Sequence, residues 1–262
     1  SSVTVFIHFE DGDEQEVDLP DSDVRVAPPI HAASTSKVDV FLNDGTSLQC
    51  DAVVCTIPVG VLQEKEAAAE PSLFHPSLPK WKRASLQRAG NGLINKVILK
   101  FERPFWDVSL DLFGCTPLSD DPADRGAFFM FWSLYRCSAD ATLVAVTSGD
   151  AALKLEGLSN EEVTNMVLRM LRALFVDMTA PIQTLVTRWN ADPCARGAYS
   201  FVQVGGTGGP DYDVLAEPVG GQIFFAGEGT CREHPSTAAG AYLTGLREAA
   251  RVHGMFIRES ST

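Results

Sequence analysis

One acidic side chain lies in a setting that suits ligand chemistry. Glu228 lies between Gly227 and Gly229 and follows the apolar run 223–226. Glycines let the backbone turn tightly around the carboxylate, and a short apolar run with aromatics is typical of a buried strand. The sequence therefore predicts a strand that ends in a turn presenting a carboxylate.

A helix is predicted to follow this turn and to point its N-terminus back at it. Pro235, Ser236 and Thr237 provide the helix start, where a hydroxyl can accept from the first unpaired amides. A helix N-terminus carries free N–H groups and partial positive charge, which suits an anion or a cofactor. Reduced flavin carries negative charge near N1 and O2 and is one good fit. An ordinary strand–turn–helix of an α/β core is the alternative, and the pattern alone leaves both open.

The predicted helix has an apolar face and a charged face. Leu243, Leu246 and Ala250 recur at helical spacing. Gly240 and Gly245 keep parts of the helix thin, so that another surface can approach closely. The charged residues expected to face outward are Arg247, Glu248 and Arg251.

A lysine inside a strand is the second group of interest. Lys96 lies in the run 93–101 among strong β-formers, on the same face as Ile94 and Ile98. Such a lysine either extends its ammonium past an edge of the sheet or occupies a pocket for a reason. The residues alone favour the first interpretation. They also favour a plain strand exit for Thr56–Pro58, which ends the buried run 51–58.

Composition bounds the function classes. The chain has 262 residues, enough for one large domain or two modest ones, with 34 acidic against 21 basic side chains and a net charge of −13. This balance argues against a broad basic surface for nucleic acid, and it suits a cationic substrate or simply solubility. No apolar run reaches the roughly 18–20 residues that span a bilayer. The six cysteines show neither a Cys-x-x-Cys pair nor zinc-like spacing, which predicts a reducing compartment and no metal.

Several motifs occur in the order of one known family. Phe-Phe-Ala-Gly-Glu at 224–228 and Gly-Ala-Tyr-Leu-Thr-Gly-Leu-Arg-Glu-Ala at 240–249 resemble the C-terminal flavin motif of the amine oxidase superfamily. They look most like the lysine-specific histone demethylases, with polyamine oxidases next. Gly-Leu-Ile-Asn-Lys-Val at 92–97 is similar to the setting of the family's active-site lysine. The resemblance extends, with gaps, from about Val38 to about Val252.

The resemblance implies roles for individual residues. Lys96 is implied to be catalytic, by holding a water against flavin N5, which reverses the interpretation from the residues alone. Trp132 and Tyr199 are implied to line the substrate pocket. Cys194 stands where the histone demethylases often place a bulkier side chain, which leaves that wall of the pocket undefined. The residues implied to bind the cofactor are Thr56, Ile57, Pro58, Trp189, Tyr199, Glu228, Thr237 and Ala238.

The cofactor implied is FAD, held without a covalent bond. Ala198 stands where the monoamine oxidases carry the cysteine that bonds FAD. Glu228 is implied to contact the ribityl–pyrophosphate part, and Thr237 and Ala238 to lie beside the isoalloxazine ring.

The expected fold class is α/β, with mixed α and β elements. Residues 1–62 and 186–262 are expected to form an incomplete FAD-binding domain of the amine oxidase type. Residues 63–185 are expected to form a substrate domain with a mixed β-sheet and helices, including a helix begun by a capping box at 159–162. The family's N-terminal strand, Gly-x-Gly-x-x-Gly turn and helix have no counterpart in the sequence, so a fragment or truncated gene product is expected.

Three functions remain open at this point. The first is histone lysine demethylation, in which a C–N bond is oxidised to an imine and hydrogen peroxide is released. The second is polyamine oxidation, and the third is a non-catalytic remnant that cannot hold FAD. The resemblance implies a basic peptide (a histone tail) or a polyamine as substrate and a chromatin corepressor as partner. It implies a nuclear location, or a cytoplasmic one for a polyamine oxidase. From the net charge and the lengths of the apolar runs, we expect the chain to bind neither nucleic acid nor a membrane directly.

Overall fold

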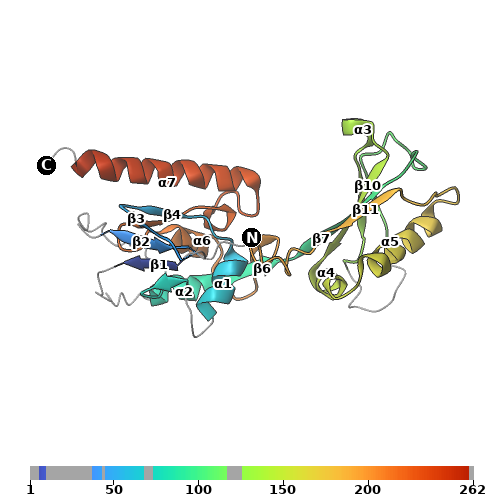
Figure 1. Ribbon diagram of the computed structural model, residues 1–262. Helices are drawn as coiled ribbons and strands as arrows, with labels where there is room; N and C mark the ends of the chain where they lie inside the picture. Colours follow the sequence, from blue (N-terminus) through green and yellow to red (C-terminus); the bar gives the residue numbers. More distant parts are fainter. Residues whose placement is uncertain (1–5, 10–36, 43–44, 68–72, 117–125, 260–262) are drawn as a thin grey trace. The chain divides into compact units, whose positions relative to one another are not determined.

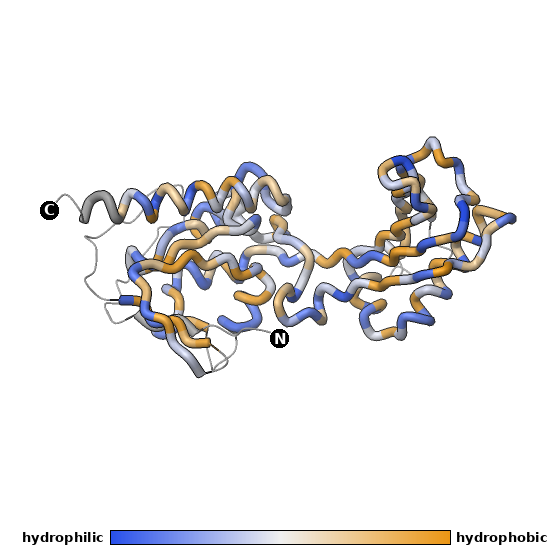
Figure 2. The backbone as a smooth tube through the Cα atoms, turned by 45° about the horizontal axis from the view of Figure 1, so that its top comes forward, coloured by the Kyte–Doolittle hydropathy of each residue, from blue (hydrophilic) through white to orange (hydrophobic). Residues whose placement is uncertain are grey.

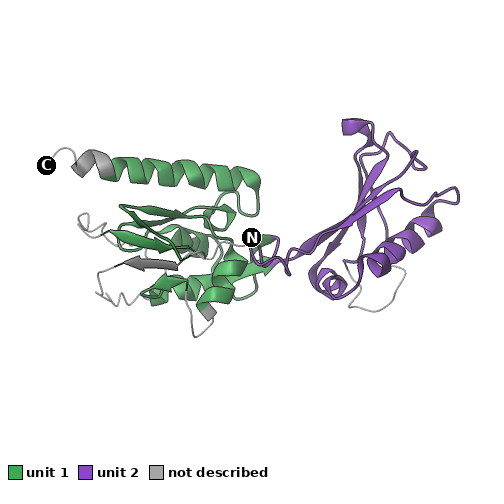
Figure 3. Cartoon of the chain, in the orientation of Figure 1, with its two compact units in different colours: residues 1–91, 199–262 green, residues 92–198 purple. Residues whose placement is uncertain are grey.

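The computed structural model describes residues 6–9, 37–42, 45–67, 73–116 and 126–259. The chain divides into two compact units, residues 1–91 with 199–262 (unit 1) and residues 92–198 (unit 2) (Figures 1 and 3). These boundaries differ from the domain boundaries expected from the sequence, which lay at 62/63 and 185/186. Each unit has its own hydrophobic core.

The described part of unit 1 contains three small sheets and four helices. The larger sheet has the order β3-β2-β1-β5, with β1 (Phe6–Phe9), β2 (Val38–Phe41), β3 (Ser47–Cys50) and β5 (Phe74–His75). In the second sheet β4 (Val53–Cys55) pairs parallel with β13 (Ile223–Phe225). The helices are α1 (Val59–Ala67), α2 (Lys80–Arg88), α6 (Gly209–Ala216) and α7 (Ala238–Glu259), with a 3-10 turn, η2, at Glu228–Thr230. A further strand pair joins β6 (Ala89–Gly92) to β12 (Tyr199–Val202).

Packing explains why α2 belongs to unit 1 rather than to the predicted substrate domain. Leu86 of α2 is part of the buried cluster that also holds Phe74, Ile223 and Phe225. Arg88, at the end of α2, donates from NH2 to Asp211 Oδ1 of α6 at 2.7 Å. The helix therefore completes the core of unit 1 from a position more than a hundred residues away in sequence from α6.

Unit 2 contains a five-stranded sheet with the order β11-β7-β10-β9-β8. Its strands are β7 (Ile94–Lys100), β8 (Leu112–Gly114), β9 (Met130–Ser133), β10 (Thr142–Ser148) and β11 (Gln183–Val186). Every pairing in this sheet is antiparallel rather than mixed as expected. The neighbours β8, β9 and β10 follow one another along the chain, so they need no crossover connection. Three helices complete the described part of the unit: α3 (Tyr135–Ser138), α4 (Gly149–Glu156) and α5 (Asn160–Leu174).

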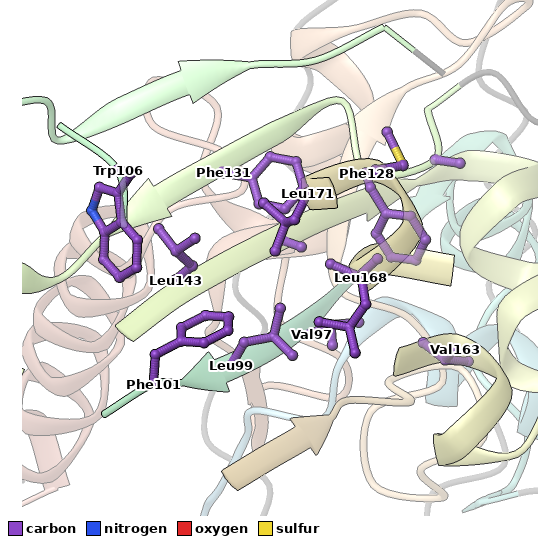
Figure 4. Packing of buried hydrophobic residues seen from close by; sticks show 14 of the residues in the cluster. Val97, Leu99, Phe101, Trp106, Phe128, Phe131, Leu143, Val163, Leu168 and Leu171 are labelled. Atoms are coloured by element: carbon purple, nitrogen blue, oxygen red, sulfur yellow. The ribbon is translucent and has the colours of Figure 1, made fainter. Parts of the chain in front are cut away.

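One face of this sheet forms the core of unit 2 (Figure 4). Val97 and Leu99 of β7 alternate with residues of the opposite face, as a strand with a period of two requires. They pack with Leu143 and Phe131 of the neighbouring strands and with Leu171 of α5. The predicted capping box begins α5: the Ser159 side chain accepts from the Glu162 amide, and the Glu162 carboxylate accepts from the Ser159 amide. The other face of the sheet is left outside this core.

Candidate functional site

The carboxyl ends of two parallel strands meet in unit 1. Phe225 of β13 is paired with Cys55 of β4, and the Ala226 amide donates to the Cys55 carbonyl at 2.9 Å. Thr56 and Gly227 therefore follow their strands at the same edge. The space beyond such strand ends is where α/β proteins bind their ligands.

The predicted glycine turn around Glu228 is confirmed. Gly227 has φ of +116°, a conformation that L side chains rarely adopt, and a Cβ added to it would meet nothing within 4 Å. Gly229 is required for a different reason, because its Cβ would lie 2.4 Å from Val59 Cγ2 of α1. The first glycine shapes the turn and leaves open space beside it, whereas the second permits close packing.

Glu228 joins three segments of unit 1 through its carboxylate. Oε1 accepts from the Ser200 amide at 2.9 Å, and Oε2 accepts from the Ser200 hydroxyl and the Ser236 amide, both at 2.7 Å. The Ser236 hydroxyl in turn donates to the Ser200 carbonyl. Ser236 is held at φ of +62°, a conformation that costs energy outside glycine and is often found at functional sites. Ser200 and Ser236 belong to this site, although the sequence reasoning gave neither a ligand role.

The predicted start of α7 is also confirmed. Thr237 Oγ1 accepts from the Gly240 amide at 2.9 Å, and the Ala241 amide donates to the Thr237 carbonyl. The amides of Ala238 and Ala239 are then the ones left at the helix N-terminus. Thr237 and Ala238 are both exposed beside the Glu228 cluster.

The other predicted cofactor residues of unit 1 lie near the same strand ends. Thr56 and Pro58 are exposed and Ile57 is half-buried, between β4 and α1. Tyr199 opens β12 and directly precedes Ser200, whose amide and hydroxyl donate to Glu228. The structure thus gathers these predicted residues of unit 1 around the ends of β4 and β13.

The charged face of α7 is oriented opposite to the expectation. Glu248 is fully buried and accepts from Arg247 and Arg251. Arg247 also donates to the carbonyls of Phe225 and Thr230, and Arg251 donates to the carbonyl of Ala216. Carbonyl groups at the ends of β13, η2 and α6 therefore draw these guanidinium groups inward. The residues left exposed are the apolar Tyr242, Leu243, Leu246 and Ala250. Hydrophobic and hydrophilic residues alternate along this helix (Figure 2).

In unit 2, Lys96 and Trp132 share the face of the sheet that lies outside the core. Lys96 is paired with Val146 of β10, and two residues further along, Ile98, Val144 and Trp132 are paired across three strands. Directly paired residues of antiparallel strands present their side chains on the same face. The predicted strand and the predicted face of Lys96 are therefore confirmed.

Lys96 is a half-buried cation in apolar surroundings. Its neighbours on this face include Ile94, Ile98 and Val146. Among the described residues, no hydrogen bond or ion pair engages its ammonium group. Trp132 is 38% exposed, so its indole remains available to a ligand.

Trp189 follows β11 in a turn that is held by a buried asparagine and a half-buried glutamate. Asn95, the neighbour of Lys96, is 2% exposed, and its Oδ1 accepts from the Trp189 amide at 3.1 Å. Its Nδ2 donates to Glu156 Oε1 at 2.7 Å. Sequence reasoning missed this pair. The signal available was an asparagine among β-formers, a residue type that strands disfavour.

The predicted site residues divide between the two units. Unit 1 carries the Thr56–Pro58 exit, Tyr199, Glu228 and the start of α7, whereas unit 2 carries Lys96, Trp132 and Trp189. Within the described residues, no group of three or more His, Cys, Asp or Glu side chains is arranged to hold a metal ion. Nor does the described chain contain a helix long and apolar enough to cross a membrane.

Parallel strand ends, an open glycine turn and an exposed helix N-terminus form a candidate cofactor site in an α/β protein. Residues 19–253 match the model of the flavin containing amine oxidoreductase family. The chain belongs to this family.

Similar proteins agree with that assignment. The chain is 43% identical over 208 residues to lysine-specific histone demethylase 1 homolog 2 of Arabidopsis thaliana, covering 78% of this chain and 27% of that protein. It is 41% identical over 239 residues to histone demethylase-like protein A of Aspergillus fumigatus, covering 87% and 22%. The chain thus spans about a quarter of the length of these relatives.

Solved structures share the fold. A putrescine oxidase structure, described as wild type bound to putrescine, aligns with a TM-score of 0.67 at 23% identity and covers 83% of this chain and 46% of that chain. An A394C mutant of putrescine oxidase aligns with a TM-score of 0.66 at 22% identity and covers 85% and 46%. The mixed α/β architecture of the amine oxidases is therefore the fold of this chain.

The family implies a flavin, and unit 1 fits one. The space beside Gly227 is open, and the exposed N-terminus of α7 offers the amides of Ala238 and Ala239 to an electron-rich group. Among the described residues, Glu228 Oε1 accepts from one donor, the Ser200 amide, so it retains a lone pair for a ligand hydroxyl. These features suit a polar, anionic cofactor edge at the ends of β4 and β13.

Proposed function

We propose that this chain forms the flavin-contacting and amine-contacting part of an FAD-dependent oxidase of methylated lysine. The observation that carries the proposal is Lys96, a half-buried cation without a partner among the described residues. It lies on an apolar sheet face that also presents Trp132. A strand lysine in that position needs a polar partner that these residues do not provide. A water held for the flavin is such a partner.

Each unit has a distinct role in this proposal. Unit 1 binds FAD without a covalent bond, with Thr56, Ile57, Pro58, Tyr199, Glu228, Thr237 and Ala238 as its contacts. Unit 2 binds the amine, with Lys96 as the catalytic residue, Trp132 as a wall of the pocket and Trp189 beside the cofactor. A bound FAD would supply the redox chemistry, a two-electron oxidation of the carbon beside the amine nitrogen with oxygen as the final acceptor and hydrogen peroxide as the product.

The side chains of this chain prepare the amine for that reaction. The apolar face around Trp132 disfavours the ammonium form, so the amine loses its proton before oxidation. Lys96 supplies a fixed N–H donor that orients a water. That water position also serves hydrolysis of the imine product to an aldehyde and the demethylated amine. Tyr199 and Trp132 exclude bulk water and orient the substrate.

The substrate proposed is a basic histone tail. The names of the relatives support it, because they are lysine-specific histone demethylase homologs and a histone demethylase-like protein. A net charge of −13 also suits a cationic substrate. A nuclear location and a chromatin corepressor as partner are part of the same proposal. Polyamine oxidation is the second candidate, and the fold shared with putrescine oxidase favours it.

The decisive experiment is anaerobic rapid mixing of the flavin-loaded full-length protein with a dimethyl-lysine histone peptide, or with spermine. Flavin bleaching by the peptide but not by spermine supports demethylation, and the reverse result supports polyamine oxidation. Lys96→Met keeps most of the stem and removes the donor. We expect it to retain FAD and to slow flavin reduction by about 100-fold or more, the scale of a lost water-positioning group.

The proposal has clear contrary outcomes. A purified protein that shows no flavin absorbance and binds no added FAD would support the non-catalytic alternative. A Lys96→Met variant that reduces its flavin at the wild-type rate would remove Lys96 from the mechanism. A variant that is slow only in reoxidation would transfer its role to the reaction with oxygen.

A further inference from the structure

Three consecutive backbone amides in unit 2 donate to one pair of side chains. The Trp189 amide donates to Asn95 Oδ1 at 3.1 Å. The Asn190 amide donates to Glu156 Oε1 at 2.9 Å, and the Ala191 amide donates to Glu156 Oε2 at 2.8 Å. Each backbone N–H of the turn 189–191 is therefore fixed by a side chain from outside the turn, either Asn95 of β7 or Glu156 of α4.

The two acceptors are themselves joined. Asn95 Nδ2 donates to Glu156 Oε1 at 2.7 Å, which links β7 to the last residue of α4. Asn95 is almost fully buried. A buried amide and a half-buried carboxylate are costly unless their hydrogen bonds are made, so their geometry is tightly specified.

The same pair is connected to the backbone of Lys96. Thr187 Oγ1 accepts from the Lys96 amide at 2.8 Å and lies 3.0 Å from Asn95 Oδ1, to which it donates. The Thr187 amide donates to the Lys96 carbonyl at 3.0 Å. Lys96 and the Trp189 turn are thus fixed relative to each other through Asn95, Thr187 and Glu156.

We infer that Asn95 and Glu156 are positioning residues for oxidation of the amine. They hold the Trp189 turn and the Lys96 strand in one rigid arrangement without touching substrate or cofactor. This inference rests on the proposed function and deepens it. Catalysis by orientation is sensitive to displacements of about 1 Å, so loosening the Trp189 turn slows flavin reduction even where Lys96 itself is intact.

The first readout is amide hydrogen exchange in residues 187–192, which needs no substrate. In Glu156→Gln, one carbonyl oxygen replaces two carboxylate oxygens, and the amides of Asn190 and Ala191 compete for it. We expect exchange at these amides to rise about tenfold or more, while exchange in β10 stays unchanged. The second readout is anaerobic flavin reduction. We expect its limiting rate to fall about tenfold while the dissociation constant of the peptide and the FAD content remain at wild-type values.

A reversed pair separates positioning from general destabilisation. Asn95→Asp alone sets two carboxylates against each other at the former 2.7 Å contact. Combining Asn95→Asp with Glu156→Gln restores a donor facing an acceptor, so we expect the double variant to regain protection of the Trp189 amide and much of the reduction rate. The matched control is Glu162→Gln, which removes a carboxylate of the same unit from the Ser159 capping box. We expect it to affect neither readout.

Three results would overturn the inference. Unchanged exchange at 189–191 in Glu156→Gln would show that the pair does not hold the turn. Loosened amides with a wild-type reduction rate would show that the turn does not position the reacting groups. If Glu162→Gln slows flavin reduction as much as Glu156→Gln does, the loss of rate reflects lower stability and not the position of the turn. If the wild-type protein is not reduced by any amine, the proposed function itself fails, and the exchange data alone then decide whether the pair orders the turn.

Discussion

Lys82 is a charged residue in the core of unit 1, and it shows how a single side chain can connect distant segments. Its Nζ donates to the carbonyls of Leu215, in the last turn of α6, and of Glu217, just beyond the helix, at 2.8 and 2.7 Å. It also lies 3.7 Å from the centre of the Phe225 ring, on the strand that leads into the Glu228 turn. The residue therefore satisfies carbonyl groups at the C-terminal end of α6 and connects them to β13.

The charge of Lys82 predicts a pH dependence of stability. Burial lowers its pKa from 10.5 to about 7, against the opposing influence of Cys55, Glu217 and Glu248. Between these values the folded chain has released a proton that the unfolded chain retains, so the free energy of unfolding rises with pH. We expect a rise of up to about 1.4 kcal/mol per pH unit between pH 7 and 8.5. Denaturant titrations at several pH values measure it, and Lys82→Met should abolish the slope.

The pH window matters for the interpretation of that experiment. Burial raises the pKa of the Cys55 thiol to about 11. Above about pH 9 the unfolded thiol ionises while the folded one does not, which lowers stability as pH rises and opposes the Lys82 effect. A slope that persists in Lys82→Met below pH 8.5 would assign it to another group.

At the scale of elements, two glycines of α7 are expected to respond differently to replacement by alanine. One replacement should raise the stability of the chain and the other should lower it. A Cβ at Gly240 would lie 2.0 Å from the His234 carbonyl oxygen, whereas a Cβ at Gly245 would meet nothing within 4 Å. We expect Gly245→Ala to stabilise the chain by about 0.5–1 kcal/mol through helix propensity. Gly240→Ala should destabilise it by at least about 1–3 kcal/mol, because the loop before α7 must shift. Thermal unfolding of both variants tests the pair, and equal effects would contradict this account of α7.

Local patterns predicted several elements, but they predicted neither the helix α6 at Gly209–Ala216 nor which way α7 faces. The capping box at Ser159 and the strand, glycine turn and helix start around Glu228 depend on residues close in sequence, so the sequence predicted them. The charged face of α7 turns inward because its acceptors are carbonyls near residues 216, 225 and 230. Helical periodicity contains no information about those partners. The Asn95–Glu156 pair was missed for the same reason, since it joins residues 61 positions apart.

At the scale of the whole molecule, unit 2 is a continuous insertion into unit 1. The Ala198 amide donates to the Gly92 carbonyl at 2.8 Å, so the two ends of unit 2 lie together. Its sheet and the helices α4 and α5 share one buried cluster. A segment with its own core and adjacent ends is the arrangement in which an inserted domain folds independently. The sequence placed the division at 63–185 because helix and loop patterns do not reveal which core α2 joins.

This arrangement predicts that residues 92–198 fold when expressed alone. We expect a cooperative denaturant transition and dispersed amide resonances, with the Asn95–Glu156 hydrogen bonds preserved as slow exchange at 189–191. The complementary protein, residues 1–91 joined to 199–262 by a short Gly-Ser linker, tests the other half. It should keep the α2–α6 contact between Arg88 and Asp211, because both residues lie in unit 1. The matched control is the segment 63–185, which lacks the Trp189 turn and carries α2 without α6. If 63–185 folds cooperatively and 92–198 does not, the boundary at Gly92 and Ala198 is wrong, and the division drawn from the sequence is the better one.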